Sequence, residues 1–144
     1  MMLIKQSNGY LRHGPKSEKY ALINRIMNLE YELFDTVNEI LLTRTDRRKS
    51  LLTKLNTRHG RLRLLYWLYY EKGCYHFQNG KNIKDENPAL GDHRYEVITN
   101  MTDEIGRMIG GWIAGERDET ARRIAANAQS KKESTDGANA AEEG

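Results

Sequence analysis

Basic side chains between residues 44 and 63 are the residues best suited to chemistry in this sequence. The stretch carries eight Lys and Arg and a single acid, Asp46. The eight are Arg44, Arg47, Arg48, Lys49, Lys54, Arg58, Arg61 and Arg63. Such a cluster attracts phosphates or an acidic partner, although a solvated helix face is the plain alternative. We therefore predict nucleic-acid or partner contacts here, above all on a helix face shared by Lys54, Arg58 and Arg61.

The uneven distribution of charge supports this reading. Residues 1–72 hold 14 Lys and Arg against 7 Asp and Glu, whereas residues 73–144 hold 9 against 13. The net charge of +3 for the 144-residue chain thus combines a basic first half with an acidic second half.

Other chemistry is weakly represented. The sequence contains no phosphate-binding loop, no His-Glu-x-x-His and no dinucleotide fingerprint. Cys74, His76 and His93, with Asp85 or Asp92, outline a metal site, but zinc ligands normally occur in tighter pairs. We predict a protein that is not an enzyme and has no metal or cofactor. A small metal-dependent enzyme using the loop of residues 73–92 is the alternative.

Apolar spacings of three and four residues predict the helices that carry these side chains. One long helix should begin near Ser17, which is a candidate cap, and end near Arg44. A second should run from about Asp46 to Lys72, with Gly73 as its C-terminal cap. Residues 73–92 are rich in Gly, Asn and Asp and read as a long loop. A third helix should span roughly residues 93–116.

The second helix ends in a group of aromatic residues. Tyr66 and Tyr69 fall on the apolar row and should pack in the core, whereas Trp67 or Tyr70 should face outward. Exposed aromatic rings can stack on bases of single-stranded RNA.

The third helix contains an unusual glycine-rich segment, Glu104–Glu116, with the sequence EIGRMIGGWIAGE. Each glycine inside a helix costs roughly 0.5–1 kcal/mol relative to alanine. Gly106 and Gly110 fall on one face, and we predict a packing groove for the aromatic end of the second helix, involving also Gly111 and Trp112. A flexible hinge is the competing interpretation.

Arg107 lies within this segment and has two interpretations. An ion pair with Asp103 one turn earlier would be worth only about 0.3–0.5 kcal/mol on an exposed surface. The functional interpretation is an intersubunit or RNA contact, and we include Arg107 among the candidate binding residues.

Three segments together resemble a known family. EIGRMIGGWIAG resembles the C-terminal helix of the bacterial four-helix bundle proteins that include the accessory variability determinant of diversity-generating retroelements and the proteins encoded in 23S rRNA intervening sequences. LRLLYWLYYEKG resembles their third helix, and GPKSEKYALINRI resembles the entry to their second helix. The resemblance covers roughly residues 14 to 116.

The resemblance implies a non-enzymatic bundle that assembles as a pentameric barrel with a basic surface. Retroelement members of this family bind the reverse transcriptase and its template RNA and support mutagenic cDNA synthesis. Relatives of the intervening-sequence type imply the alternative, a structural or interaction protein without a polymerase partner.

The sequence departs from this family at three places. Only 14 residues precede Pro15, so the first helix should be short, remodelled or absent. The family often carries two arginines one turn apart in its third helix, where this chain has Leu65 and Tyr69. The loop over residues 73–92 is also longer than usual.

We therefore expect an all-α, antiparallel helical bundle that assembles as a homo-oligomeric barrel. The expected division is an N-terminal segment over 1–16, the bundle over 17–116, a helical extension over 117–129 and a disordered tail over 130–144. The lone Cys74 excludes an intramolecular disulfide, and no apolar run reaches the roughly 18 residues of a membrane span. We expect a cytoplasmic protein without a membrane partner.

Overall fold

The computed structural model describes residues 2–44 and 46–143, with side chains described up to Lys131 outside that gap. The described chain is mostly helical, which confirms the all-α class. Its α-helices are α1 (Met2–Leu11), α2 (Asn24–Leu42), α3 (Arg47–Glu71) and α4 (Leu90–Glu143). The chain divides into two compact units, Met1–Ile109 and Gly110–Gly144.

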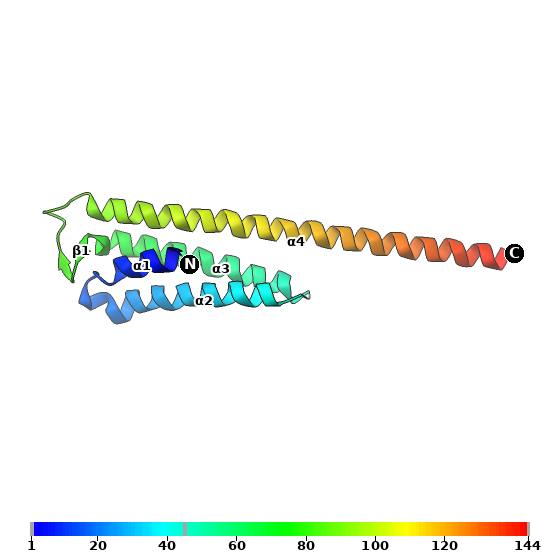
Figure 1. The fold of residues 1–144 in the computed structure, drawn as a ribbon, viewed down its shortest axis with the longest axis horizontal. Helices are drawn as coiled ribbons and strands as arrows, with labels where there is room; N and C mark the ends of the chain where they lie inside the picture. The colour runs from blue at the N-terminus through cyan, green and yellow to red at the C-terminus, as the bar shows by residue number, and fades with distance from the viewer. Residues whose placement is uncertain (1, 45, 144) are drawn as a thin grey trace. The chain divides into compact units, whose positions relative to one another are not determined.

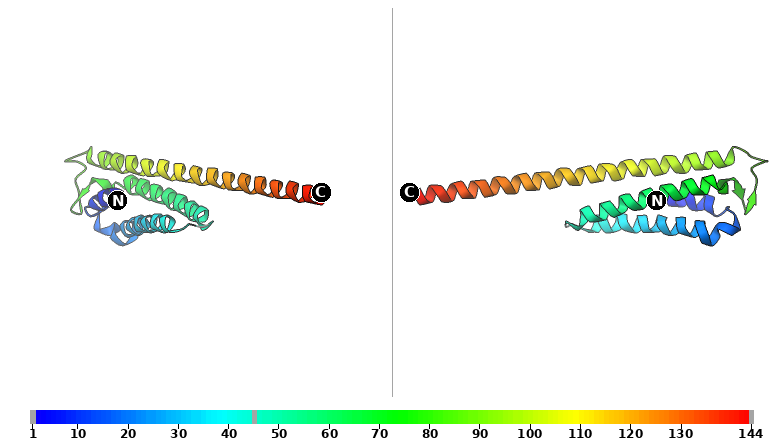
Figure 2. Two further views of the ribbon diagram at one scale, coloured as in Figure 1. Left: turned by 45° about the vertical axis from the view of Figure 1, so that its right-hand side comes forward. Right: turned by 180° about the vertical axis from the view of Figure 1, so that it is seen from behind.

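The first unit is a helical bundle. Successive helices run in opposite directions, and α1, α2 and α3 lie side by side in each view (Figures 1 and 2). A short link, residues 43–46, joins α2 to α3. The part of α4 up to Ile109 contributes the fourth helix of this bundle. The predicted antiparallel bundle is therefore correct within one chain.

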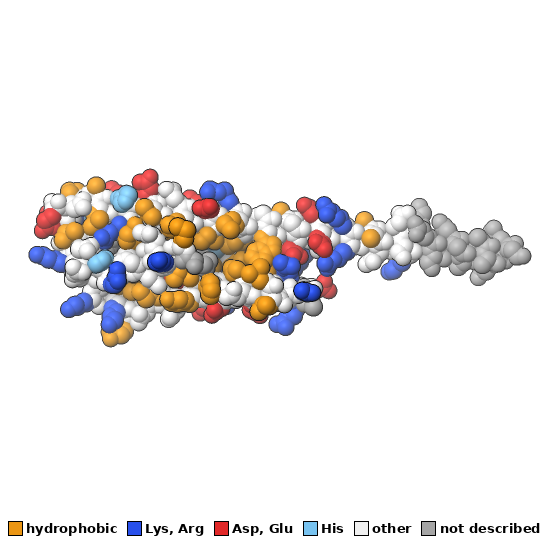
Figure 3. Space-filling model, viewed as in Figure 1, with side chains coloured by type: hydrophobic (Ala, Val, Ile, Leu, Met, Phe, Trp, Pro, Cys, Tyr) orange, Lys and Arg blue, Asp and Glu red, His pale blue; other side chains and the backbone are white. Residues whose placement is uncertain are grey.

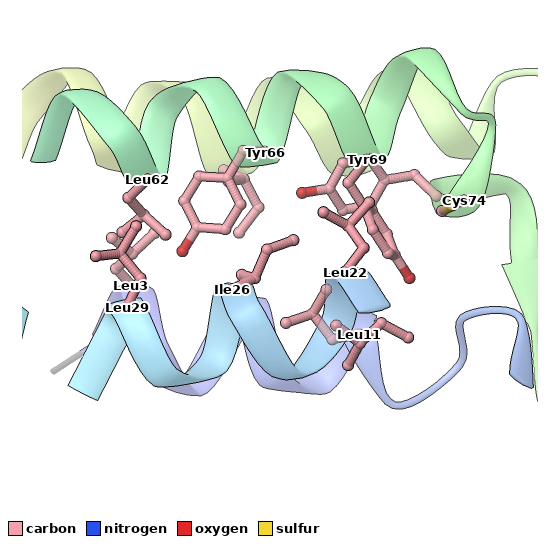
Figure 4. Packing of buried hydrophobic residues seen from close by; sticks show 12 residues of the cluster. Leu3, Leu11, Leu22, Ile26, Leu29, Leu62, Tyr66, Tyr69 and Cys74 are labelled. Atoms are coloured by element: carbon pink, nitrogen blue, oxygen red, sulfur yellow. The ribbon is translucent and has the colours of Figure 1, made fainter. Parts of the chain in front are cut away.

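Regular apolar spacing builds the core of the bundle. The buried positions of α3 after Leu51 recur at intervals of three and four, and they include Leu55, Leu62, Tyr66 and Tyr69. Matching residues of α1 and α2, among them Leu11 and Ile26, pack against this row (Figure 4). Each Å² of apolar surface that such a stripe buries stabilises the bundle by roughly 25 cal/mol.

The N-terminal helix is short, which is one of the three predicted outcomes, and it belongs to the bundle. Leu3, Ser7 and Leu11 are four residues apart and almost fully buried. This differs from the predicted separation of residues 1–16 from the bundle over 17–116. Asn8 and Gly9 are poor helix formers, yet burial of the leucine face offsets their propensity.

The approach to α2 also differs from the prediction of one helix beginning at Ser17. Residues Lys16–Glu18 form a 3₁₀ turn, η1, and Lys19–Ile23 form a π-helical turn, η2. Pro15 occupies the N-cap position of η1, and no side chain caps it. Ser17 is therefore not a cap, because it lies inside the turn rather than before it.

Residues 73–92 are more ordered than a plain loop. Gly73 has φ of 75° and follows the end of α3, so it is the predicted C-terminal cap. A 3₁₀ turn, η3 (Cys74–His76), leads into an antiparallel hairpin of β1 (Phe77–Gln78) and β2 (Lys81–Asn82). Asn79 and Gly80 connect the strands with positive φ angles of 52° and 79°. Asn-Gly is the strongest short hairpin signal, so the sequence contained this information.

The C-terminal helix extends beyond its predicted end. The structure continues α4 to Glu143, whereas the sequence predicts a helical extension only to residue 129 and a disordered tail over 130–144. Ala, Glu and Lys are prominent after residue 129, and their high helix propensity is compatible with a continued helix. Gly144 lies outside the described residues.

Candidate nucleic-acid interface

An exposed row of positive charge runs along the first half of α3. Arg47, Lys54 and Arg61 are exposed and are seven residues apart, so they lie on nearly the same face of the helix. At a rise of about 1.5 Å per residue, the row extends over roughly 21 Å. None of the three forms an ion pair within the described residues. Lys49 is exposed on another side of α3, and Arg44 is exposed in the preceding link.

Two other predicted contact residues are occupied by partners in the bundle. The guanidinium of Arg58 donates to the hydroxyl of Thr36, and its Nε lies 3.9 Å from Glu32 on α2. Arg63 pairs with Asp103 on α4. These arginines tie α3 to its neighbours, so they are less available to a ligand than Arg47, Lys54 and Arg61. Arg48 is half-buried and also has an interaction within the protein.

The second half of α3 exposes apolar side chains beyond the basic row. Leu64, Trp67 and Leu68 are 65, 49 and 40% exposed. Tyr66 and Tyr69 are buried, which confirms the predicted inward and outward division of the aromatic residues. Figure 3 shows hydrophobic patches interspersed with Lys and Arg side chains on one face of the molecule. The helix therefore presents cations at one end and an apolar patch at the other.

Leu65 and Tyr69 stand where the family that this chain resembles often carries two arginines, and they do not form a ligand surface here. Leu65 is half-buried, and Tyr69 is fully buried in the core. The usual arginine positions thus serve packing in this chain, and the exposed cations lie closer to the N-terminus of α3.

Arg107 is exposed on α4 and does not form the alternative ion pair with Asp103. Asp103 pairs instead with Arg63, which comes from α3. Within the described part of the chain, Arg107 has no ion-pair partner. It therefore stays a candidate for an external contact.

The predicted glycine groove exists at Gly106, but a histidine ring occupies it instead of the predicted aromatic layer. A Cβ atom on Gly106 would lie 2.9 Å from Cε1 of His59, so the missing side chain admits the imidazole ring. Nε2 of His59 donates to the carbonyl oxygen of Thr102 at 2.8 Å and holds the ring there. Around a Cβ on Gly110 or Gly111, both in the second unit, no described atom outside the helix's own nearby backbone lies within 4 Å.

Two alanine substitutions should distinguish these glycines. We expect Gly106→Ala to destabilise the protein by about 1–2 kcal/mol, because the new methyl group displaces the fixed His59 ring. Gly110→Ala has free space and should gain about 0.5–1 kcal/mol in helix propensity. Urea unfolding at a low protein concentration measures both values. Equal effects of the two substitutions would contradict the packing role of Gly106.

Trp112, the other residue of the predicted packing groove, is half-buried and lies in the second unit.

The loop residues do not assemble the alternative metal site. Cys74 and His76 are buried at the end of α3, whereas His93 is exposed on α4. Burial raises the pKa of the Cys74 thiol to about 11, which disfavours the thiolate that metals require. In the described parts of the chain, no group of three or more His, Cys, Asp or Glu residues could hold a metal ion.

Arg94 is a buried cation that sequence reasoning missed. Its guanidinium donates to the carbonyl oxygens of Tyr75 and Phe77 and, at 2.7 Å, to Oε1 of Gln78. It also lies 5.3 Å from the ring centroid of Tyr10, and desolvation lowers its pKa. Arg94 thereby fixes the β1–β2 hairpin against α1 and α4. Its partners are distant in sequence, so no local pattern identifies it.

Comparisons with protein-family models, curated proteins and solved structures found no match to this chain. None of the described helices combines the length and apolar character needed to cross a membrane.

Proposed function

We propose that this chain is a non-enzymatic accessory protein of a diversity-generating retroelement. In this proposal it binds the template RNA and the reverse transcriptase in the cytoplasm and supports mutagenic cDNA synthesis. The family resemblance of residues 14–116 supplies the partners. The helical bundle is compatible with that resemblance but is shared by many unrelated proteins.

The exposed row of Arg47, Lys54 and Arg61 carries the nucleic-acid part of the proposal. Within the described residues none of the three cations forms an ion pair, which leaves them available to phosphate groups. Trp67, farther along α3, offers an exposed ring on which a base can stack. Phosphate contacts give affinity without sequence information, which suits a scaffold for a template.

A homopentamer is part of the proposal and follows from the resemblance. The exposed apolar side chains Leu64 and Leu68 and the open backbone at Gly110 and Gly111 support contacts between copies, since exposed apolar patches mark interaction sites. Sedimentation at the mass of five chains is the expected result, and sedimentation at monomer mass would refute the pentamer.

Removal of the α3 charges tests RNA binding. The triple variant Arg47→Gln, Lys54→Gln, Arg61→Gln should bind single-stranded RNA more weakly. Its plot of log affinity against log salt should lose about 0.7 of slope for each lost phosphate contact, or about 2 in all. Filter binding between about 50 and 300 mM salt measures the slope.

A charge-matched control separates a specific row from general attraction. Lys81→Gln, Lys84→Gln, Arg117→Gln removes three exposed cations elsewhere and lowers the net charge equally. The control should retain the wild-type slope. If it weakens RNA binding as much as the α3 variant, the row is not the interface. Wild-type protein without salt-dependent RNA binding would overturn the nucleic-acid part entirely.

The enzyme partnership needs its own measurement. The proposal expects a reverse transcriptase gene beside this one. That enzyme should require the chain for normal cDNA synthesis, and the α3 triple variant should reduce the yield. Normal synthesis without the chain would refute the accessory role.

A further inference from the structure

A cavity of about 870 Å³ lies between α1 and the turns that lead into α2. It is lined from one side by residues of α1 and from the other by η1, η2 and the first turn of α2. Figure 1 shows the connecting segment at the end of the bundle where α1 and α2 meet. The volume falls within the range of small-molecule sites, roughly 300–1,000 Å³.

Four cations line this cavity, and no acidic residue does. They are Lys5, Arg12, Lys16 and Lys19. The one acid in residues 1–29 is Glu18, whose carboxylate is engaged 2.5 Å from Nζ of Lys72. None of the four cations forms an ion pair within the described residues. The cavity therefore favours an anion.

The inner lining is apolar with two amides. Leu11, Ile23 and Met27 supply aliphatic surface, and Asn8 and Asn24 supply the amides. Nδ2 of Asn8 donates to the hydroxyl of Tyr31 at 3.3 Å, and its Oδ1 is buried with almost no accessible surface. Asn24 is half-buried, and its side chain forms no hydrogen bond within the described residues. The amide of Asn24 can therefore donate to and accept from the polar edge of a ligand.

The π-helical turn η2 shapes the cavity wall. Its wide turn places both Lys19 and Ile23 on the lining, and the N–H of Asn24 bonds to the carbonyl of Lys19. Single π turns are rare and occur frequently at functional sites. Here the turn brings a charged and an aliphatic side chain to the same site.

We propose that this cavity binds a nucleotide, either free or at the 5′ end of a strand. The phosphate would contact Lys16 and Lys19, while the base lies on the aliphatic surface of Ile23 and Met27. The base edge would form hydrogen bonds with the side-chain amide of Asn24. A simple inorganic anion would leave the apolar lining uncovered, and a fatty acid would leave the Asn24 amide without a polar partner. This site is separate from the α3 row and does not depend on RNA binding there.

Calorimetric titration with AMP, adenosine and inorganic phosphate tests the proposal. AMP should bind at least tenfold more tightly than adenosine or phosphate, because only AMP uses both the cations and the inner lining. The double variant Lys16→Gln, Lys19→Gln should lose at least tenfold in AMP affinity. Asn24→Ala should also weaken AMP, with little effect on phosphate.

The charge-matched control is Arg117→Gln, Arg122→Gln, which removes two exposed cations from the second unit and should leave AMP affinity unchanged. Thermal unfolding confirms that each variant is folded. Phosphate binding as tight as AMP would overturn the nucleotide assignment. AMP affinity unchanged in Lys16→Gln, Lys19→Gln would overturn the location.

Short oligoadenylates with a 5′-phosphate or a 5′-hydroxyl distinguish a free nucleotide from the 5′ end of a strand as the ligand. A 5′-phosphorylated strand that displaces AMP and binds at least tenfold more tightly identifies a strand end, whereas tighter AMP identifies a free nucleotide. Failure of AMP and of both strands to bind refutes the proposal. Because these titrations leave the α3 row intact, that failure is independent of the result with the α3 variant.

Discussion

Gly14→Ala is expected to destabilise the bundle by about 3 kcal/mol or more, a large part of the 5–15 kcal/mol that a small domain possesses. Gly14 is buried where α1 turns toward η1. A Cβ there would overlap the hydroxyl oxygen of Tyr69 and lie 3.0 Å from Cδ1 of Ile23. The ring of Tyr69 is fully buried and packs at 4.7 Å, centroid to centroid, on Tyr75, so it has little freedom to move.

Three further variants make this prediction specific. The hydroxyl of Tyr69 is buried without a hydrogen-bond partner in the described chain, so Tyr69→Phe alone should cost little. Gly14→Ala combined with Tyr69→Phe should recover about half of the loss, since the overlapping atom is gone. Gly60→Ala, at an open position of α3, should be neutral or stabilising. Urea unfolding of all four proteins provides the test. An equal loss in the single and double variants would exclude this contact as the cause.

The helices of the bundle were predictable because their signal is local. The buried row of α3 from Leu55 to Tyr69 follows one period, and the same period predicts that Trp67 faces outward. The hairpin at Asn79 and Gly80 was equally local, and its dipeptide would have predicted it.

The pairing of charged residues was not predictable from the same pattern. Arg58 and Arg63 look identical in sequence to the exposed Arg61, yet their partners are 22 and 40 residues away. Helical spacing gives the face on which an arginine lies, but the neighbouring helix decides whether its charge is available. The candidate interface therefore contracts from a cluster of eight cations to a row plus a few exposed neighbours.

The partner of the glycine groove was hidden for the same reason. The spacing of Gly106 and Gly110 predicts a face without side chains, but it does not say which ring lies there or how far the contact extends. His59 fills the position at Gly106 because it precedes Leu62 by three on the buried row of α3. Its polar ring is accommodated by the carbonyl of Thr102.

Glu30 should make the bundle less stable as pH rises from about 5 to 8. Its carboxylate is fully buried on α2, and Oε1 accepts hydrogen bonds from Ser7 at 2.5 Å and Tyr66 at 2.8 Å. Oε2 has no partner among the described residues. Burial raises the pKa of Glu30 from 4.5 to about 7, and the two hydrogen bonds only partly oppose that effect.

The sign follows from the preference of the folded protein for the proton. Below pH 4.5 the carboxyl is protonated in both states, and its folded environment costs nothing extra. Between pH 4.5 and about 7 the unfolded chain ionises while the folded chain keeps its proton, so stability is progressively lost. From pH 5 to 8 the expected loss from this one group is about 2–3 kcal/mol.

Glu30→Gln should remove this pH dependence, because the amide is neutral throughout and retains an oxygen acceptor for Ser7 and Tyr66. Glu39→Gln, at an exposed position of the same helix, should behave as the wild type. Urea unfolding at pH 5 and pH 8, which bracket the pKa of about 7, measures the difference for each protein. A carboxyl ¹³C titration of Glu30 should show a midpoint near 7. If Glu30→Gln retained the full pH difference, another group would have to be its source. Loss of that difference only in Glu30→Gln would show that the junction of α1, α2 and α3 is held together by a protonated carboxyl group.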